Sequence, residues 1–280
     1  MSTDRATINN VLEEATARLA TGTARLDAEV LLACALQQPR SHLYAWPEQV
    51  VTSAVLNTFT GLLQRRAAGE PVAYLTGARE FWSLPLTVTT ATLIPRPETE
   101  TLVELALEKL PVNSPLQVAD LGTGSGAIAL ALASERPACR IVATDISSQA
   151  VHVADANAAR LGLANIEFVT GDWCAPLPAT RFDMIVSNPP YVIETDPHLV
   201  AGDVRFEPRA ALAAGPEGMD ALTHIARSSA EYLRRDGWLL VEHGYDQGEQ
   251  TVDLFHACGF RHVSDHTDGA GASRVTMGMK

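Results

Sequence analysis

The sequence lacks an excess of basic residues and any long uninterrupted apolar run. Its 280 residues include 21 Lys and Arg against 33 Asp and Glu, which gives a formal net charge of -12 at pH 7. A protein that binds nucleic acid mainly through its phosphates needs a basic face, so this balance argues against that class and leaves room only for a local basic patch. No apolar stretch is long enough to cross a bilayer, and residues 1–5 lead into a mixed-polarity helix rather than a signal peptide. We therefore expect a cytoplasmic protein without a membrane partner.

Cysteine is also scarce. The four cysteines, Cys34, Cys139, Cys174 and Cys258, show no CxxC spacing, so we expect reduced, mostly buried thiols and no metal site.

Hydrophobic residues make up 46% of the chain and charged residues 19%, a composition that predicts a packed core rather than disorder. A chain of 280 residues is long for a single domain, and we expect one large and one small domain.

The N-terminal part of the chain has the apolar periodicity of helices. Apolar residues recur at helical spacing in three stretches, residues 8–15, 26–36 and 50–68. We therefore predict a small helical bundle over residues 1–75. In residues 76–92 aromatic and aliphatic residues are interspersed with Gly, Ser, Pro and Thr, which predicts a β-hairpin linker to the next domain.

Predicted strands and helices alternate regularly over residues 93–280. This pattern is typical of a doubly wound α/β fold with a largely parallel sheet. Strands are expected at residues 116–120, 140–145, 166–169, 182–186, 238–242, 261–263 and 273–277, and helices at 101–110, 127–134, 150–161, 219–233 and 250–258. Ligands of such sheets bind at the carboxyl ends of the strands, so the residues that end these runs are candidate site residues.

The first of these strands ends in a glycine-rich turn. The turn comprises Asp120, Leu121, Gly122, Thr123, Gly124, Ser125 and Gly126. Glycines let the backbone approach a ligand closely, and the N-terminus of the following helix favours negative groups. The Gly-x-Gly-x-Gly spacing differs from the Gly-x-Gly-x-x-Gly fingerprint of dinucleotide sites, and it favours S-adenosylmethionine over a nicotinamide dinucleotide. A plain tight turn is the alternative explanation.

The next two strands also end in residues suited to an adenosine. Asp145 ends the second strand, where a carboxylate can accept hydrogen bonds from both ribose hydroxyls. Asp172 and Trp173 follow the third strand, where an acid can accept from the adenine amino group and an aromatic ring can pack on the adenine face. Each has a simpler alternative, since Asp145 can cap the helix that begins near Ser147 and Asp172 can be an ordinary loop carboxylate. Together with the glycine turn, they predict an adenosine-bearing cofactor.

The fourth strand stops abruptly at Asn188, Pro189, Pro190 and Tyr191. The two prolines have no N–H for a sheet, and Asn188 precedes a proline and is therefore pushed towards an extended conformation. We expect a stiff turn that presents an amide side chain, free carbonyl groups and a tyrosine ring at a strand end. An ordinary proline-rich turn is the alternative.

A rigid charged segment, Ile94-Pro95-Arg96-Pro97-Glu98-Thr99-Glu100, precedes the helix predicted over residues 101–110. Glu98 or Thr99 can cap the first turn of this helix. The segment can equally form a wall or lid over a ligand. The sequence leaves both interpretations open.

The glycine turn followed by Asn-Pro-Pro-Tyr resembles class I S-adenosylmethionine methyltransferases, and within them the HemK/PrmC family of release factor glutamine N5-methyltransferases. The resemblance runs over nearly the whole chain. The motifs that carry it are Gly69 to Gly77, Glu80-Phe81-Trp82, Leu93 to Glu100, the glycine turn, Asn188 to Tyr191, Phe206 to Leu212 and Gly218-Met219-Asp220. The Pro-Arg-Pro-Glu-Thr and Phe-Glu-Pro segments are more restrictive than the tetrapeptide, which also occurs in enzymes that methylate adenine amines.

This resemblance implies a seven-stranded class I methyltransferase sheet over residues 93–280 and a release-factor-recognition role for residues 1–75. It also implies that the enzyme methylates the glutamine of the Gly-Gly-Gln motif of peptide chain release factors, in support of translation termination, with S-adenosylmethionine as the cofactor. The cofactor-binding residues would be Asp120, Gly122, Thr123, Gly124, Ser125, Gly126, Asp145, Asp172, Trp173 and Asn188. Asn188, Pro189, Pro190 and Tyr191 would hold the glutamine, and Asn188, Pro189 and Tyr191 would be catalytic.

Three rival functions remain at this point. An adenine N6-methyltransferase would use the same tetrapeptide, but the acidic charge and the absence of an appended basic domain count against it. A nicotinamide-dependent oxidoreductase would usually carry the other glycine spacing. A non-catalytic release-factor-binding protein would not need these motifs intact. The sequence gives no base for the amide proton, no preferred release factor and no oligomeric state.

Overall fold

The structure is a computed structural model that describes residues 6–280 of the chain. It divides into two compact units. The first runs up to Gly77 and also includes Gly202–Phe206, and the second comprises Ala78–Ala201 and Glu207–Lys280. The inclusion of residues 202–206 in the helical unit was not expected from the sequence, because this segment lies far along the chain.

The helical unit contains α1 (Ile8–Arg18), α2 (Ala24–Leu36), α3 (Arg40–Ala45), α4 (Ser53–Ala67) and α5 (Val72–Thr76). The short α3 and α5 were not predicted. Helix α4 begins later than the apolar pattern suggested, because the Thr52 side chain accepts a hydrogen bond from Val55 N and caps it. Within this unit the buried Arg66 forms ion pairs with Asp27 and with Asp203 of the 202–206 segment, at 2.8 and 2.7 Å. A buried guanidinium with two carboxylate partners holds that segment in place.

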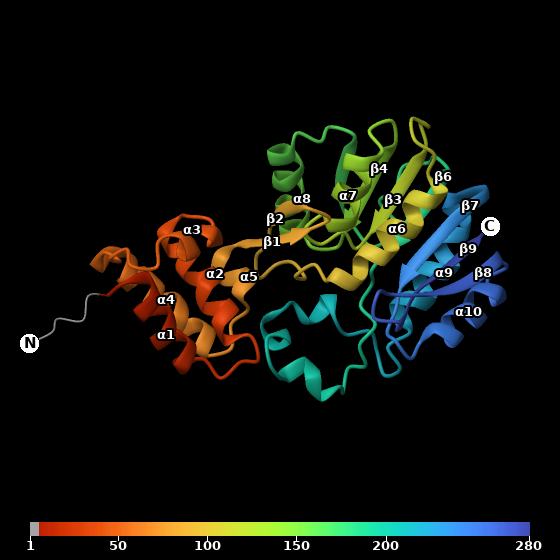
Figure 1. The fold of residues 1–280 in the computed structure, drawn as a ribbon. Coiled ribbons are helices and arrows are strands. Elements are labelled where there is room, and N and C mark those ends of the chain that lie inside the picture. Colours follow the sequence, from red (N-terminus) through yellow and green to blue (C-terminus); the bar gives the residue numbers. More distant parts are fainter. Residues whose placement is uncertain (1–5) are drawn as a thin grey trace, which may run out of the picture. The chain divides into compact units, whose positions relative to one another are not determined.

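The larger unit is built on a mixed sheet (Figure 1). Among the described residues the sheet has seven strands in the order β5-β4-β3-β6-β7-β9-β8. The strands are β3 (Gln117–Leu121), β4 (Arg140–Asp145), β5 (Ile166–Thr170), β6 (Phe182–Ser187), β7 (Leu233–Glu242), β8 (Arg261–Thr267) and β9 (Ser273–Met279). Strand β9 is antiparallel to both β7 and β8, and the other pairings are parallel. The predicted doubly wound α/β fold is therefore confirmed.

Helices cover both faces of this sheet. They are α6 (Glu100–Lys109), α7 (Ala127–Glu135), α8 (Ser148–Leu161), α9 (Asp220–Tyr232) and α10 (Gly248–Ala257). Neighbouring strand residues point into opposite cores, as Val118 and Ala119 do: Val118 packs with buried residues of α6 and α7, and Ala119 with those of α9 and α10. Burial on both faces explains why these strands are almost continuously apolar.

A hairpin of β1 (Ala78–Phe81) and β2 (Leu84–Thr87) precedes the sheet, where the sequence predicted one. Its turn places Trp82 and Ser83 at φ angles of 52° and 58°. The buried Asn157 of α8 fixes the hairpin, since its side chain bonds both Thr87 N and Thr87 O at 2.8 and 3.0 Å. The hairpin therefore belongs with the larger unit.

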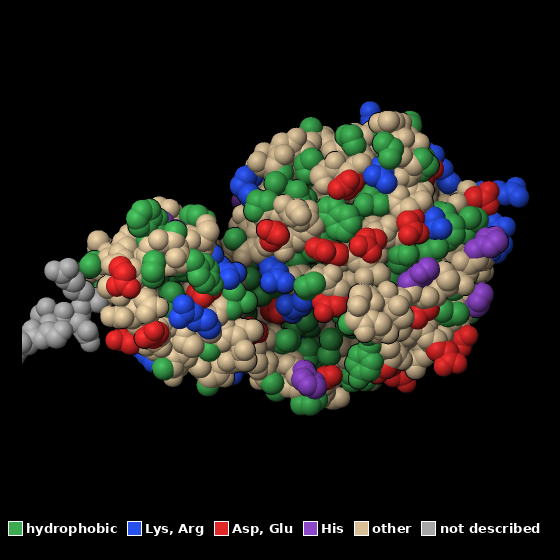
Figure 2. Space-filling model, in the orientation of Figure 1, with side chains coloured by type: hydrophobic (Ala, Val, Ile, Leu, Met, Phe, Trp, Pro, Cys, Tyr) green, Lys and Arg blue, Asp and Glu red, His purple; other side chains and the backbone are tan. Residues whose placement is uncertain are grey.

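The excess of acidic residues in the sequence is visible on the surface. Asp and Glu side chains are spread over the visible face of both units (Figure 2). In residues 6–280 no helix has both the length and the apolar character needed to cross a membrane. All four cysteines are free: Cys139 and Cys174 are buried, Cys258 is half-buried and Cys34 is exposed.

Candidate active site

The strand order reverses between β3 and β6. From β3 the chain builds outward through β4 and β5, and then returns to place β6 on the other side of β3. Leu121 and Ser187, the last residues of these two strands, are paired, and the Ser187 hydroxyl donates to Leu121 O at 2.7 Å. Such a switch point opens a crevice at the carboxyl ends of the strands. The glycine turn and the Asn188 tetrapeptide leave the sheet at this crevice.

The glycine turn is fixed by its neighbouring strand. The backbone N–H groups of Gly122 and Thr123 both donate to Thr144 O of β4, each at 2.9 Å. Gly122 has a φ of 73°, and a Cβ on it would lie 3.1 Å from the Trp173 ring. Glycine is therefore required here both for its conformation and for the close approach of that ring.

A cavity of about 490 Å³ lies over the turn. Its lining includes the predicted residues Gly122, Gly124, Asp145, Asp172, Trp173, Asn188 and Pro190. Its other walls come from residues 90–93, Ile146, Ser147, Gln149 and Gly171, and from the segment with Pro208, Ala210 and Ala211. Residues from the ends of β3, β4, β5 and β6 thus meet in one space, as the sequence predicted.

Two smaller pockets adjoin this cavity through Asn188. One, of about 50 Å³, is lined by Thr123 and Ser125 together with Arg96 and Thr99. The other, of about 40 Å³, is lined by the whole Asn188-Pro189-Pro190-Tyr191 turn with Leu93, Arg96 and Leu212. Asn188 lines all three spaces and stands where they join.

Asp120 and Gly126, also predicted as cofactor-binding residues, line none of these pockets. Asp120 is completely buried and accepts a hydrogen bond from the Thr123 hydroxyl at 2.7 Å. Burial raises its pKa to about 7, although the bond from Thr123 acts in the opposite direction. Gly126 has a φ of 87° and precedes α7. Both residues therefore support the glycine turn from the side away from the cavity.

Asp145 has two backbone partners. Its Oδ2 accepts from Gly124 N and its Oδ1 accepts from Ser147 N, each at 2.9 Å. The Ser147 side chain, and not Asp145, caps α8 by accepting from Ala150 N. Each carboxylate oxygen retains acceptor capacity, so Asp145 can hold the glycine turn and still bind hydroxyl groups in the cavity.

Trp173 forms the opposite wall. Its φ of 42° lies in the left-handed region that a large aromatic residue rarely adopts. The Thr144 hydroxyl donates to Trp173 O at 2.9 Å and helps to hold this conformation. The conformation places the half-buried ring beside Gly122 at the cavity wall, whereas the neighbouring Asp172 is exposed at its edge.

Asn188 and Tyr191 each hydrogen-bond to a buried polar residue. Its Nδ2 donates to the Thr99 hydroxyl at 3.1 Å. The Tyr191 hydroxyl donates to Oε1 of Glu242, the last residue of β7, at 3.2 Å. Burial raises the pKa of Glu242 to about 7, opposed by hydrogen bonds from Thr99 and Tyr191 and by the positive charge of Arg274. Burial, reinforced by the charge of Glu242, also raises the pKa of Tyr191, which stays a protonated donor.

The Arg96 segment is a wall of the site. Pro97–Thr99 form a short 3-10 helix before α6, and Thr99 stands at the N-cap position of α6 without a side-chain capping bond. The capping interpretation is therefore wrong for Thr99, whose hydroxyl contacts Asn188 instead. Arg96 lines both small pockets and forms an ion pair with the buried Glu207, which also accepts from Ile94 N at 3.0 Å.

Sequence reasoning missed three contributors to this site: Thr99 as a partner of Asn188, Glu207 as the anchor of Arg96, and Glu242. Glu207 was part of a motif of the family resemblance without an assigned role. Glu242 ends an apolar run, and a charged residue at the carboxyl end of a predicted strand was the signal that identified Asp145. The same signal applied to β7 would have found it.

Two family models match this chain. The family model "PrmC N-terminal domain" matches residues 10–77, and "Methyltransferase small domain" matches residues 99–210. A methyltransferase structure from Pyrococcus furiosus superposes with a TM-score of 0.55 at 16% identity, covering 79% of this chain and 98% of that one, which supports the fold alone.

Two curated relatives cover almost the full length. The release factor glutamine methyltransferase of Vibrio cholerae is 48% identical over 277 residues, which are 98% of this chain and 96% of that protein. The protein of the same name from Escherichia coli K12 is 49% identical over 268 residues, with 95% and 96% covered. This chain belongs to the release factor glutamine methyltransferase family.

Proposed function

We propose that the protein transfers a methyl group from S-adenosylmethionine to the side-chain amide nitrogen of the glutamine in the Gly-Gly-Gln motif of peptide chain release factors. The observation that carries this proposal is the near-half identity to such enzymes over almost the whole of both chains. The peptide chain release factor would be the protein substrate, recognised in part by residues 1–75. Because translation termination takes place in the cytoplasm, we infer that the protein acts there.

The main cavity fits the proposed cofactor. Its volume of about 490 Å³ is within the range of small-molecule sites, and its walls are a glycine turn, a strand-end carboxylate and an aromatic ring. Asp145 would bind the ribose hydroxyls, and Trp173 would pack against the adenine with Asp172 at its rim. The main chain of Gly122 and Gly124 would approach the cofactor most closely, and Asp120 and Gly126 would support the turn from the side away from the cavity. Bound there, S-adenosylmethionine supplies a methyl group already activated by its sulfonium charge.

The remaining task is to make an amide nitrogen nucleophilic. The lone pair of a primary amide is delocalised into its carbonyl, so the site has to orient the nitrogen and stabilise the positive charge that develops on it. The amide NH2 has two donors. We assign one to the Asn188 Oδ1 and the other to the Pro189 carbonyl oxygen. Tyr191 and Pro190 would enclose the amide plane and exclude water.

Mass spectrometry of a release factor incubated with S-adenosylmethionine, with and without the protein, tests the proposal. We expect the peptide containing Gly-Gly-Gln to gain one methyl group, located on the glutamine by fragmentation. DNA and RNA offered in the same assay should remain unmethylated. Methylation of adenine in place of glutamine would favour the nucleic-acid alternative, and binding of the release factor without any methyl transfer would favour a non-catalytic role.

Asp145→Ala should weaken cofactor binding by about 10- to 100-fold, because it removes both the ribose contacts and the bond to Gly124 N, and a hydrogen bond to a charged group contributes about 1.5–3 kcal/mol. Calorimetric titration with S-adenosylhomocysteine measures the change. Asp155→Ala, an exposed aspartate on the following helix, is the matched control and should bind as the wild type does. Equal affinity of the Asp145 variant would remove this residue from the cofactor site.

A further inference from the structure

Glu242 is a buried carboxylate with an incomplete set of partners. Its residue exposure is 1%, and it lies at the carboxyl end of β7, next to β6 in the sheet. Oε1 accepts from the Tyr191 hydroxyl at 3.2 Å, and the Thr99 hydroxyl lowers the pKa of the carboxylate as a hydrogen-bond donor does. Among the described residues Oε2 has no partner that meets the usual geometric limits. Carboxylates are rarely buried in this way unless paired, so the position calls for an explanation.

The polarity of these bonds determines which way the Asn188 amide faces. An ionised carboxylate can only accept, so the Thr99 hydroxyl interacts favourably with Glu242 when its proton points towards the carboxylate. The Thr99 oxygen is then left as an acceptor, and Asn188 meets it with Nδ2, at 3.1 Å. The other end of the amide, Oδ1, is consequently available for a donor in the pockets that Asn188 lines.

We propose that Glu242 is a positioning residue for methyl transfer, whose carboxylate, through the Thr99 hydroxyl, makes Asn188 present its oxygen and not its NH2 to the acceptor amide. The inference rests on the proposed function, since the acceptor is there an NH2 group that needs an acceptor opposite it. The carboxylate also holds the Tyr191 hydroxyl, so one group fixes both polar side chains of the tetrapeptide.

Protonation of Glu242 would release this constraint. A carboxylic acid has a proton of its own to donate, so Thr99 can turn its hydroxyl proton towards Asn188, and the amide then rotates to offer Oδ1 to Thr99 and NH2 to the substrate. Two NH2 groups facing each other cannot hydrogen-bond. Turnover therefore requires the ionised form of Glu242.

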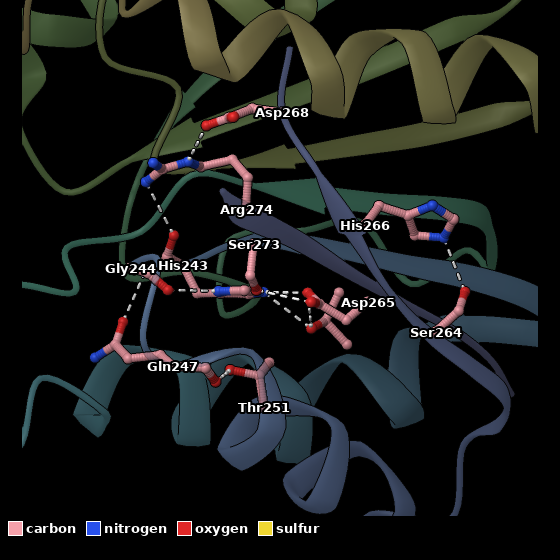
Figure 3. Close-up of polar contacts among 11 residues, drawn as sticks. His243, Gly244, Gln247, Thr251, Ser264, Asp265, His266, Asp268, Ser273 and Arg274 are labelled. Atoms are coloured by element: carbon pink, nitrogen blue, oxygen red, sulfur yellow. Dashed lines mark hydrogen bonds and ion pairs between the residues drawn. The ribbon is translucent and has the colours of Figure 1, made fainter. Parts of the chain in front are cut away.

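The charged and titratable groups that face Glu242 come from several elements. Arg274 of β9 favours the ionised form, Glu98 opposes it, and Tyr191 donates to it. Arg274 is itself held by Asp268 at 3.2 Å and by His243 O at 3.4 Å (Figure 3). Burial outweighs these favourable contacts and raises the pKa of Glu242 to about 7, from an ordinary value of 4.5. The transition thus falls in an accessible pH range.

The test is the pH dependence of kcat for methylation of a release factor at saturating substrates, in the wild type and in Glu242→Gln. We expect the wild-type rate to fall about tenfold per pH unit below a midpoint near 7. Glu242→Gln, a neutral and nearly isosteric side chain, should be about 10²-fold slower at pH 8 and should lose this acidic limb. Its affinity for S-adenosylhomocysteine should stay within about twofold of the wild type, because Glu242 does not line the main cavity.

Asp183→Asn is the control. Asp183 is a carboxylate near the opposite end of β6, where it accepts from Gln117 N at 2.7 Å and pairs with Arg234. Neutralising it should leave the acidic limb of kcat in place. Two further variants test the link between Glu242 and Asn188 through Thr99. Thr99→Ser keeps the hydroxyl and should keep the acidic limb of kcat. Thr99→Val should have a lower kcat and should lack the acidic limb.

Stability supplies a readout that does not depend on turnover. The pKa of Glu242 is raised in the folded protein, so the native state holds this proton more tightly than the unfolded chain does, and its contribution to stability falls as the pH rises from about 4.5 to about 7. Glu242→Gln does not ionise. Its Tm should therefore rise relative to that of the wild type across this interval and stay level above it.

Several outcomes would overturn the inference. Unchanged turnover or a retained acidic limb in Glu242→Gln would do so, as would full activity of Thr99→Val, which would point to direct proton transfer to Glu242. If Glu242→Gln does not fold, the contrast between Thr99→Ser and Thr99→Val decides. A wild type that methylates no glutamine would instead refute the proposed function, so the two failures are distinguishable.

Discussion

Asn188→Ala should lower kcat for release factor methylation by about 10²-fold or more, the scale observed when one preorganised polar contact to developing charge is removed. The alanine lacks the Oδ1 that we assign to the acceptor NH2, and it also leaves the buried Thr99 hydroxyl without its donor. The Pro189 carbonyl remains, so some activity should persist. Single-turnover methyl transfer to a release factor, followed by mass spectrometry, gives the rate directly.

The loss should appear mainly in the chemical step. Asn188 also borders the main cavity, so we expect a shift of cofactor affinity of no more than a few fold, set against the larger loss of kcat. Asn165→Ala is the matched control, because the Asn165 amide donates to Ala133 O, Arg136 O and Cys139 O, away from the site. That variant should lose stability and keep its turnover. Near-normal turnover of Asn188→Ala would remove the tetrapeptide amide from the mechanism.

The strand-end residues were predictable because a parallel sheet brings all carboxyl ends to one edge. Given the alternation of strands and helices, Gly122, Asp145, Trp173 and Asn188 had to lie along that edge whatever the order of the strands. The order itself, with β6 beside β3, was not readable from one sequence. It is this adjacency that places Asn188 over the glycine turn rather than elsewhere along the sheet.

The residues that hold Asn188 and Arg96 in place were not predictable. A residue that caps its own helix and a residue that bonds to a distant segment look alike in sequence. Thr99 stands where a threonine caps a helix, yet its hydroxyl contacts Asn188, 89 residues further along the chain. Arg96 and Glu207 are separated by 111 residues and meet in an ion pair. A capping pattern depends only on neighbours in the chain, whereas these bonds depend on how two loops leave the sheet.

Gly218→Ala should nearly abolish turnover and lower the stability of the fold. Gly218 has a φ of 71°, and a Cβ built on it would lie 2.3 Å from Tyr191 O and 2.8 Å from Gln247 Nε2. The amide of Gln247 can move, but the carbonyl belongs to the tetrapeptide turn, where Gln247 Nε2 donates to it at 3.1 Å. The turn must therefore shift, and the acceptor amide would no longer be aligned with the methyl donor.

The cost of this substitution combines overpacking of about 1–3 kcal/mol with the strain of a left-handed alanine. Moving the Gln247 amide does not relieve the contact with the Tyr191 carbonyl, and it would break the bond that Gln247 Oε1 accepts from Gly244 N at 2.8 Å (Figure 3).

Gly162→Ala is the control that introduces an alanine at the same φ without a steric contact. Gly162 ends α8 with the same φ of 71°, but a Cβ on it meets nothing within 4 Å. This variant should lose about 1 kcal/mol for the left-handed conformation and retain full turnover. Chemical denaturation and kcat measured on both variants provide the comparison. If the two variants lost the same stability and the same turnover, the left-handed conformation of the alanine would account for both losses. The contact between Gly218 and the Tyr191 carbonyl would then have no role in holding the tetrapeptide.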